Sequence, residues 1–251
     1  GKTILEDISF EINQGDCVAL IGPNGAGKTV LMSCILGDKK PSSGQVLIDG
    51  KAGKAKNQIA VLLQENTIPN SLKVSELIAF FQAVSDNPLT NQEVQNLLRF
   101  KEDQYQQFAD KLSGGQRRLL AFVLCLIDKP KILFLDEPTA GMDTSTRQRF
   151  WEIVNDLKKA GTTILYSSHY IEEVEHTADR ILVLHQGKLI RDTTPYAMRH
   201  EEKEKQVTLP SRFVSIVHGL PDIYEITEKR DVVSFMTKDI EKVWQSLENS
   251  G

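Results

Sequence analysis

The hydrophobic positions of this chain change from one pattern to another along its length. Near-continuous apolar runs occur at residues 17–22, 131–137 and 162–169, and such runs are typical of strands buried on both faces of a parallel sheet. Stretches with a helical pattern follow them, at residues 28–36, 145–159 and 171–177. This alternation predicts an α/β fold with a central, mainly parallel sheet and right-handed crossovers.

Two other patterns interrupt the alternation. Residues 4–12 and 43–50 read as short alternating strands, which predicts an N-terminal antiparallel β section. Between residues 70 and 111 no strand is indicated, and Leu77, Ile78, Phe81 and Val84 are spaced for one helix face. A second helix is expected over residues 91–100, capped by Thr90 or Asn91. We therefore expect a helical subdomain over about residues 70–128.

The composition changes after Asp192. A run of charged residues at 199–205 indicates a solvated helix end or linker. The last fifty residues then read strand, helix, strand, strand, helix. We expect one large domain over residues 1–198 and a small αβ extension over 199–251, which either packs as an appendage or contacts a partner or ligand.

Composition and charge narrow the class of protein. The 251 residues carry a net charge of −4 and a pI near 5.8, which disfavours wholesale binding to nucleic acid. No apolar run is long enough to cross a bilayer, and no signal segment is evident at the N-terminus. Three cysteines lie in apolar surroundings without metal-type spacing and are expected to be reduced core thiols. These features predict a soluble cytoplasmic protein.

The strongest motif lies between the first expected strand and helix. The sequence GPNGAGKT matches G-x-x-x-x-G-K-[ST], the pattern of a phosphate-binding loop. Glycines let the backbone N–H groups approach phosphates, while the lysine reaches the β- and γ-phosphates and the threonine hydroxyl holds Mg²⁺. The expected nucleotide-binding residues are Gly22, Pro23, Asn24, Gly25, Ala26, Gly27, Lys28 and Thr29.

Polar residues end the other expected strands. Asp136 follows a buried strand and can contact Mg²⁺, and Glu137 beside it can orient the attacking water. His169 ends the next strand and can hydrogen-bond a γ-phosphate, although a lone histidine is more often structural. Gln64 ends another apolar run, where its amide can touch Mg²⁺ or the attacking water, or can be a simple polar strand end. Lys28, Gln64, Glu137 and His169 are the expected catalytic residues, and Thr29, Gln64 and Asp136 the expected Mg²⁺ ligands.

A second glycine-rich turn, LSGGQ, precedes the helix expected to run to about residue 128. It consists of Leu112, Ser113, Gly114, Gly115 and Gln116. Ser113 is a good helix cap, so plain capping is one interpretation. The turn is also suited to an anion, since helix N-termini bind phosphate. One phosphate loop needs no second cradle in the same subunit, but a head-to-tail dimer can place this turn over the partner's ATP.

These motifs, in this order, resemble the nucleotide-binding subunit of ATP-binding cassette (ABC) transporters over about residues 1–193. The resemblance implies that two subunits sandwich two ATP molecules with Mg²⁺, and that Ser113 and Gly115 bind the partner's γ-phosphate. It also implies that Asp143, in the AGMD motif, communicates across the dimer as the D-loop residue. Gln64 would connect the site to the helical subdomain and to a separate membrane permease.

Within the family, the sequence after the signature looks most like exporter-type subunits. These hydrolyse ATP to drive transport and sit in the cytoplasm, peripheral to the inner face of the membrane through the permease. The alternative is a soluble, non-transport cassette ATPase, for example of the cluster-assembly type, which would co-purify with soluble scaffold proteins.

Overall fold

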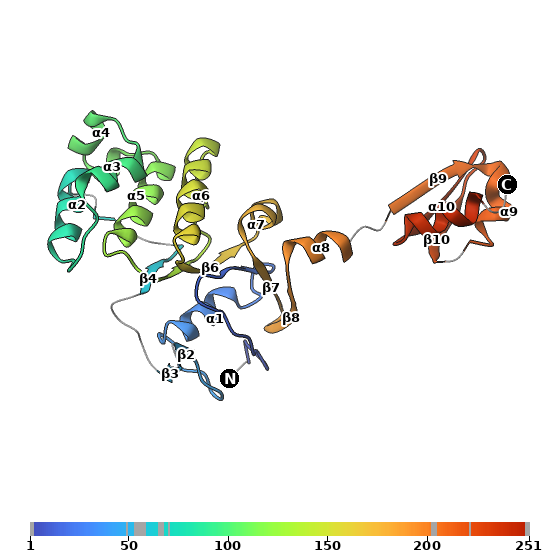
Figure 1. Cartoon of the computed structure of the whole chain (residues 1–251), viewed down its shortest axis with the longest axis horizontal. Coiled ribbons are helices and arrows are strands. Elements are labelled where there is room, and N and C mark those ends of the chain that lie inside the picture. Colours follow the sequence, from blue (N-terminus) through green and yellow to red (C-terminus); the bar gives the residue numbers. More distant parts are fainter. Residues whose placement is uncertain are drawn as a thin grey trace. The chain divides into compact units, whose positions relative to one another are not determined.

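The computed structural model describes residues 3–48, 50–52, 59–64, 68–69, 71–201, 205–220 and 222–248. The chain divides into two compact units, Gly1–Pro195 and Tyr196–Gly251. This division lies three residues before the boundary expected from the sequence. Figure 1 shows both units coloured along the sequence.

A six-stranded sheet forms the centre of the first unit, with the strand order β4-β5-β6-β1-β7-β8. The strands in this order are Ile59–Leu62, Ile132–Leu135, Thr163–Ser168, Cys17–Ile21, Arg180–His185 and Lys188–Thr193. The first five run parallel, and β8 is antiparallel to β7. The α/β fold expected from the apolar runs is confirmed.

The parallel sheet is covered on both faces, as its continuous apolar strands require. Every residue of β1 is buried. Val18 and Leu20 pack with Leu31 and Met32 of α1 (Lys28–Ile35) in one core cluster. In Figure 1, α1 lies on one side of the strands, whereas α5 (Gly114–Leu126), α6 (Thr144–Lys159) and α7 (Ile171–Thr177) lie on the other. Each fully buried leucine or methionine contributes about 1.5–3 kcal/mol relative to exposure.

The helical subdomain is present where the pattern predicts it. It contains α2 (Val74–Ala83), α3 (Asn91–Leu98), α4 (Glu102–Gln106) and a 3₁₀ turn at Ala109–Lys111. Thr90 caps α3, because its hydroxyl accepts a hydrogen bond from the N–H of Glu93 at 3.2 Å.

The expected apolar face of α2 is only half buried. Leu77 and Ile78 are in the core, but Phe81 is 36% and Val84 67% exposed. The helix therefore turns part of its apolar stripe to the surface.

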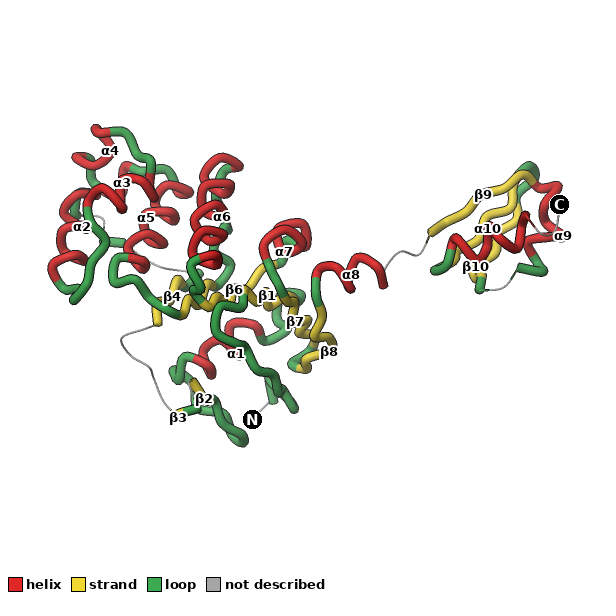
Figure 2. Tube along the Cα trace, in the orientation of Figure 1, coloured by secondary structure: helices red, strands yellow, loops and turns green. Residues whose placement is uncertain are grey.

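The antiparallel N-terminal section is smaller than expected. It consists of β2 (Leu47–Ile48) paired with β3 (Lys51–Ala52) (Figure 2). The strand expected over residues 4–12 does not form. Asp7 has a left-handed φ of 48°, which interrupts an extended run. The apolar residues of this N-terminal segment instead pack individually against the core cluster; they are Leu5, Ile8, Phe10 and Ile12.

The second unit follows the order expected for its last fifty residues. After α8 (Pro195–Glu201), strands β9 (Lys205–Pro210), β10 (Ile223–Glu228) and β11 (Val232–Thr237) form an antiparallel sheet in the order β10-β11-β9. The helical elements are Ser211–Phe213, α9 (Val214–Val217) and α10 (Ile240–Glu248). This unit has a small hydrophobic core of its own, which consists of Val217, Val233, Phe235 and Val243. Residues 202–204 of the charged run lie outside the described residues.

The three cysteines carry no disulfide. Cys17 is buried, whereas Cys34 and Cys125 are partly buried. Burial raises the pKa of Cys17 to about 12 and that of Cys125 to about 11, so both are inert thiols at neutral pH. Within the described residues, no helix combines the length and the apolar character needed to span a bilayer.

Candidate functional site

The strand order brings the predicted polar residues to one edge of the sheet. Gln64 lies just beyond β4, Asp136 directly after β5, His169 directly after β6, and Gly22 directly after β1. These four strands are consecutive neighbours, β4-β5-β6-β1, and they run parallel. Their carboxyl ends therefore meet at one edge, where α/β proteins bind ligands.

The phosphate loop (residues 22–29) has the backbone that its glycines permit. Gly25 and Gly27 have φ values of 80° and 107°, a region that L side chains rarely adopt. Gly22 has no room for a side chain, because an added Cβ would lie 2.2 Å from the carbonyl oxygen of Leu184. Gly27 is the N-cap of α1 and provides no side-chain hydrogen bond, so the first N–H groups of the helix are suited to bind an anion.

Lys28 is held inside this loop. Its side chain is buried, and its Nζ donates to the carbonyl oxygens of Gly22 at 2.7 Å and Pro23 at 3.4 Å. The turn between β7 and β8 supports the phosphate loop from outside, because the N–H of Gly187 donates to Ala26 O at 3.0 Å. Main-chain carbonyl groups thus hold the ammonium group of Lys28 inside the loop.

Thr29 and Asp136 meet across the sheet edge. The Thr29 hydroxyl donates to Asp136 Oδ2 at 3.1 Å, and the Ser167 hydroxyl donates to Asp136 Oδ1 at 2.5 Å. A hydroxyl and a carboxylate beside a phosphate loop are the oxygen ligands that Mg²⁺ takes in nucleotide sites. The residues present therefore fit a Mg²⁺ ion held by Thr29 and Asp136, whose charge would offset that of the phosphates.

Glu137 occupies a strained position. Its φ is 43°, an uncommon value for a residue with a side chain and one that often marks a functional site. Its N–H donates to Ser167 Oγ at 2.8 Å, and its carbonyl accepts from Ala140 N at 3.2 Å. Its Oε2 lies 3.4 Å from Nδ1 of His169. The predicted water-positioning carboxylate and the predicted histidine thus face each other from neighbouring strands.

Gln64 is placed differently from the other strand-end residues. It is exposed, and within the described residues no hydrogen bond joins its side chain to Thr29 or Asp136. Its carbonyl oxygen accepts from Arg118 Nη1 at 3.2 Å. The backbone of Gln64 is therefore fixed, while its amide is free to meet a ligand.

The signature turn (residues 112–116) is closed on itself. The Ser113 hydroxyl accepts from Gln116 N at 3.2 Å, and Ser113 N donates to Gln116 Oε1 at 3.1 Å. This capping box satisfies two N–H groups at the start of α5, those of Ser113 and Gln116. Gly115 is buried against the D-loop of the same chain, because an added Cβ would lie 3.1 Å from Asp143 Oδ2.

Asp143 caps α6. Its Oδ1 accepts from Thr146 N at 3.0 Å, and its Oδ2 from the Thr146 hydroxyl at 2.7 Å. The Thr146 hydroxyl and then its N–H lower the pKa of Asp143 below the ordinary aspartate value. The ionised carboxylate is therefore the form that the fold holds.

Two functional contacts escaped the sequence analysis. Ser167 joins the carboxylate of Asp136 to the backbone of Glu137, and its only signal in the sequence is a hydroxyl within an apolar strand. Glu173 accepts from the Thr139 hydroxyl at 3.0 Å and lies 3.4 Å from Arg147 Nε. This contact links α7, which follows His169, to the segment between Glu137 and Asp143.

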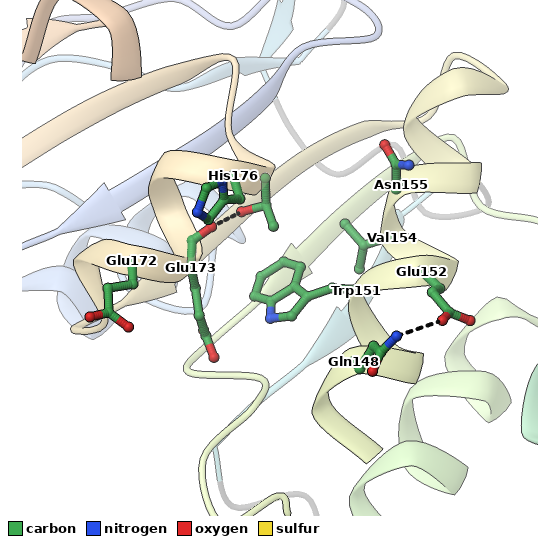
Figure 3. A pocket seen from close by; sticks show the side chains of 9 residues that line it. Gln148, Trp151, Glu152, Val154, Asn155, Glu172, Glu173 and His176 are labelled. Atoms are coloured by element: carbon green, nitrogen blue, oxygen red, sulfur yellow. Dashed lines mark hydrogen bonds between the residues drawn. The ribbon is translucent and has the colours of Figure 1, made fainter. Parts of the chain in front are cut away.

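A cavity of about 500 Å³ lies between α6 and α7, beside Glu173 (Figure 3). Trp151 and Val154 form its apolar wall, and Glu172, Glu173 and His176 face it from α7. None of the predicted site residues lines it. The chemistry is therefore assigned to the open edge of the sheet and not to this cavity.

Comparison with known proteins agrees with the motifs. A family model described as "ABC transporter" matches residues 5–140. The chain is 33% identical over 214 residues to "Nod factor export ATP-binding protein I" of Rhizobium johnstonii, covering 80% of this chain and 68% of that protein. It is 30% identical over 225 residues to "Probable multidrug ABC transporter ATP-binding protein YbhF" of Escherichia coli, covering 85% and 39%. A solved structure described as the ATP binding subunit of an ABC transporter superposes with a TM-score of 0.68 at 28% identity, covering 78% and 85%.

Proposed function

This chain belongs to the ABC transporter family, and we propose from that premise that it is the ATP-hydrolysing subunit of an exporter. It works as one of a head-to-tail pair of nucleotide-binding subunits on a separate membrane permease. It is held at the cytoplasmic face of the membrane by that permease. The export assignment is supported by relatives named for Nod factor export and for multidrug transport, which favour it over a soluble cluster-assembly ATPase.

One observation carries the proposal: residues that follow four separate strands come together at one edge of the sheet. The phosphate loop presents its N–H groups and Lys28 to the phosphates. Thr29 and Asp136, whose side chains are in contact at 3.1 Å, would hold the Mg²⁺ ion. Glu137 orients water for in-line attack, and Gln64 contacts that water or the Mg²⁺ ion. His169, 3.4 Å from Glu137, stabilises the transferring group.

Ser113 and Gly115 complete the partner's site in this proposal. The Ser113 hydroxyl accepts from Gln116 N, and its own proton is available to donate to the partner's phosphate without loss of that capping bond. Asp143, packed against Gly115, transmits the presence of that phosphate to α6.

A surface for the permease is proposed on the helical subdomain. Phe80 is 59% and Val84 67% exposed at the end of α2, and Phe108 beside the start of α2 is 46% exposed. Phe80 and Phe81 also stack edge to face at 5.7 Å. The exposed apolar group of Phe80, Phe81 and Val84 at the end of α2 favours a protein interface over free solvent.

The hydrolytic role is tested with Glu137→Gln. We expect Mg-ATP binding to be retained, while the rate of phosphate release falls by about a hundredfold or more, the lower range for losing a general base. Glu172→Gln, which changes an exposed glutamate of α7, is the matched control and should hydrolyse at the wild-type rate. Wild-type turnover in Glu137→Gln would overturn the assignment.

The export role is tested by the location of the tagged chain in its own cells. We expect it in the membrane fraction after gentle lysis, and in the soluble fraction after a high-pH wash. Val84→Glu should lose membrane retention while the purified protein keeps its basal hydrolysis. Recovery of the wild-type chain only with soluble scaffold proteins would support the alternative.

A further inference from the structure

Arg118 makes an unusual set of contacts for a residue outside the recognised motifs. It lies on α5, three residues after Gly115, and its guanidinium is partly buried. Nε donates to Pro138 O at 3.1 Å, and Nη2 donates to Asp136 O at 3.0 Å. Nη1 donates to the carbonyl oxygens of Leu63 and of Gln64, the latter at 3.2 Å.

These four carbonyl groups belong to two strand ends of the hydrolytic site. Leu63 and Gln64 follow β4, and Asp136 and Pro138 lie on either side of Glu137 after β5. A further backbone bond, from Asp136 N to Leu62 O at 2.8 Å, joins the same two strands. Arg118 therefore spans the segments that carry the expected Mg²⁺ carboxylate and the expected water-contacting amide.

A guanidinium is suited to this position. It is planar, always charged, and presents five N–H donors in a fixed arrangement. In the part of the chain that the structure describes, its hydrogen bonds go to main-chain carbonyl oxygens, and burial lowers the pKa of Arg118. Partial burial of a charge costs free energy that uncharged packing would avoid, and this cost is consistent with a role of Arg118 beyond stability.

The other end of the same helical turn carries the signature residues. Ser113 caps α5, and Gly115 is packed against Asp143. Residues three apart on a helix lie about 4.5 Å apart along its axis, so a displacement of the signature turn moves the guanidinium with it. The carbonyl groups of Gln64 and Asp136 would follow through the hydrogen bonds.

We propose that Arg118 is a positioning residue, which couples the signature turn to the Mg²⁺ side of its own subunit's site. The signature turn serves the partner's ATP, so this coupling lets each nucleotide site register the occupancy of the other. The proposal rests on the head-to-tail dimer of the proposed function.

Arg149 provides a matched comparison within the same domain. It too donates to main-chain carbonyls, those of Leu97 at 2.9 Å and Asn96 at 2.6 Å, and it pairs with Glu152. These contacts hold the end of α3 and touch no residue of the hydrolytic site. Arg149→Gln should therefore lower stability without changing the coupling.

The test compares Arg118→Gln, Arg118→Lys and Arg149→Gln in three measurements. These are Mg-ATP affinity at monomer concentrations, dimer formation with Mg-ATP in the Glu137→Gln background, and kcat with KM in the otherwise wild-type chain. For Arg118→Gln we expect ATP affinity within about twofold of wild type, but dimer affinity and kcat lowered by about tenfold or more, the equivalent of one charged hydrogen bond. Arg118→Lys should fall between, because one ammonium cannot reach all four carbonyls.

Each outcome decides the proposal. Wild-type kcat and dimerisation in folded Arg118→Gln would overturn it, as would an equal loss in Arg149→Gln. If Arg118→Gln does not fold, Arg118→Lys replaces it, and wild-type values there would be equally contrary. Failure of the Glu137→Gln chain itself to dimerise would instead count against the proposed dimer, and Arg118 would then be judged on kcat alone.

Discussion

The phosphate loop and the signature turn are both glycine-rich and both lead into a helix, but they are built differently. The phosphate loop has glycines with φ of 80° and 107°, an N-cap without a side-chain hydrogen bond, and an internal lysine. The signature turn has a conventional serine cap with a capping box and no lysine. The first therefore places an ammonium group of its own beside its N–H groups, whereas the second offers a hydroxyl and main-chain N–H groups without a lysine, which fits the proposal that it serves a partner's nucleotide.

Loss of the loop lysine should produce the largest effect. Lys28→Gln removes the one charge held at the centre of the phosphate loop. We expect hydrolysis to fall by about a hundredfold or more, the usual cost of removing a preorganised charge from a transition state. Initial rates of phosphate release would measure it, with the exposed Lys39→Gln as the control. Equal rates for the two variants would contradict the role of Lys28.

Alanine in each turn separates folding from function. Gly22→Ala places a Cβ 2.2 Å from Leu184 O, and we expect this unit to lose about 4 kcal/mol or fail to fold. Gly114 has nothing within 4 Å of an added Cβ, so Gly114→Ala should keep its stability within about 0.5 kcal/mol. Thermal unfolding would measure both.

The same Gly114→Ala variant then reports on the partner. Because the fold leaves space at Gly114, a loss of hydrolysis or of ATP-driven dimerisation must come from outside the subunit. Wild-type hydrolysis in Gly114→Ala would mean that this glycine approaches no partner phosphate closely.

The local motifs were easier to predict than the contacts between them. The phosphate loop is eight consecutive residues whose spacing specifies its backbone, and the strand ends followed from apolar runs. The contacts of Ser167 with Asp136 and Glu137 depend on which strand lies beside which. The pattern of a single sequence does not give the order of strands in the sheet, so no role could be predicted for Ser167 within its apolar strand.

Arg118 and residues 4–12 both show that a local sequence pattern does not determine tertiary contacts. Arg118 is a charge one turn into a helix that becomes largely apolar, and only the packed structure reveals four carbonyls around it. Residues 4–12 have a strand-like alternation, but Glu6 N donates to the Gly187 carbonyl at 2.9 Å instead of joining a ladder. Tertiary contacts thus overrode a local pattern.

Two capping boxes of the helical subdomain that have a hydroxyl at the N-cap test the role of the signature serine. Ser113 with Gln116 and Thr90 with Glu93 make the same reciprocal bonds at α5 and α3. Ser113→Ala and Thr90→Ala should each lower the free energy of unfolding by about 1 kcal/mol, as lost caps do. Only Ser113→Ala should also lower hydrolysis. Equal rates of hydrolysis in the two variants would mean that Ser113 acts only as a helix cap.

The smallest expected effect concerns the D-loop carboxylate that touches the signature turn. The pKa of Asp143 is lowered in the folded chain by the Thr146 hydroxyl and N–H. Its ionised form therefore stabilises the fold at pH values above the ordinary aspartate pKa, and the contribution is lost as pH falls through the lowered value. Asp143→Asn keeps an acceptor for the helix cap but removes the charge. The wild type should melt at a higher temperature than Asp143→Asn at neutral pH, and this difference in melting temperature, the gap, should close under acid.

Asp156→Asn, which removes an exposed charge from the same helix, is the control and should not reproduce that gap. A gap that persists unchanged below about pH 3 would show that the ionised carboxylate is not its source.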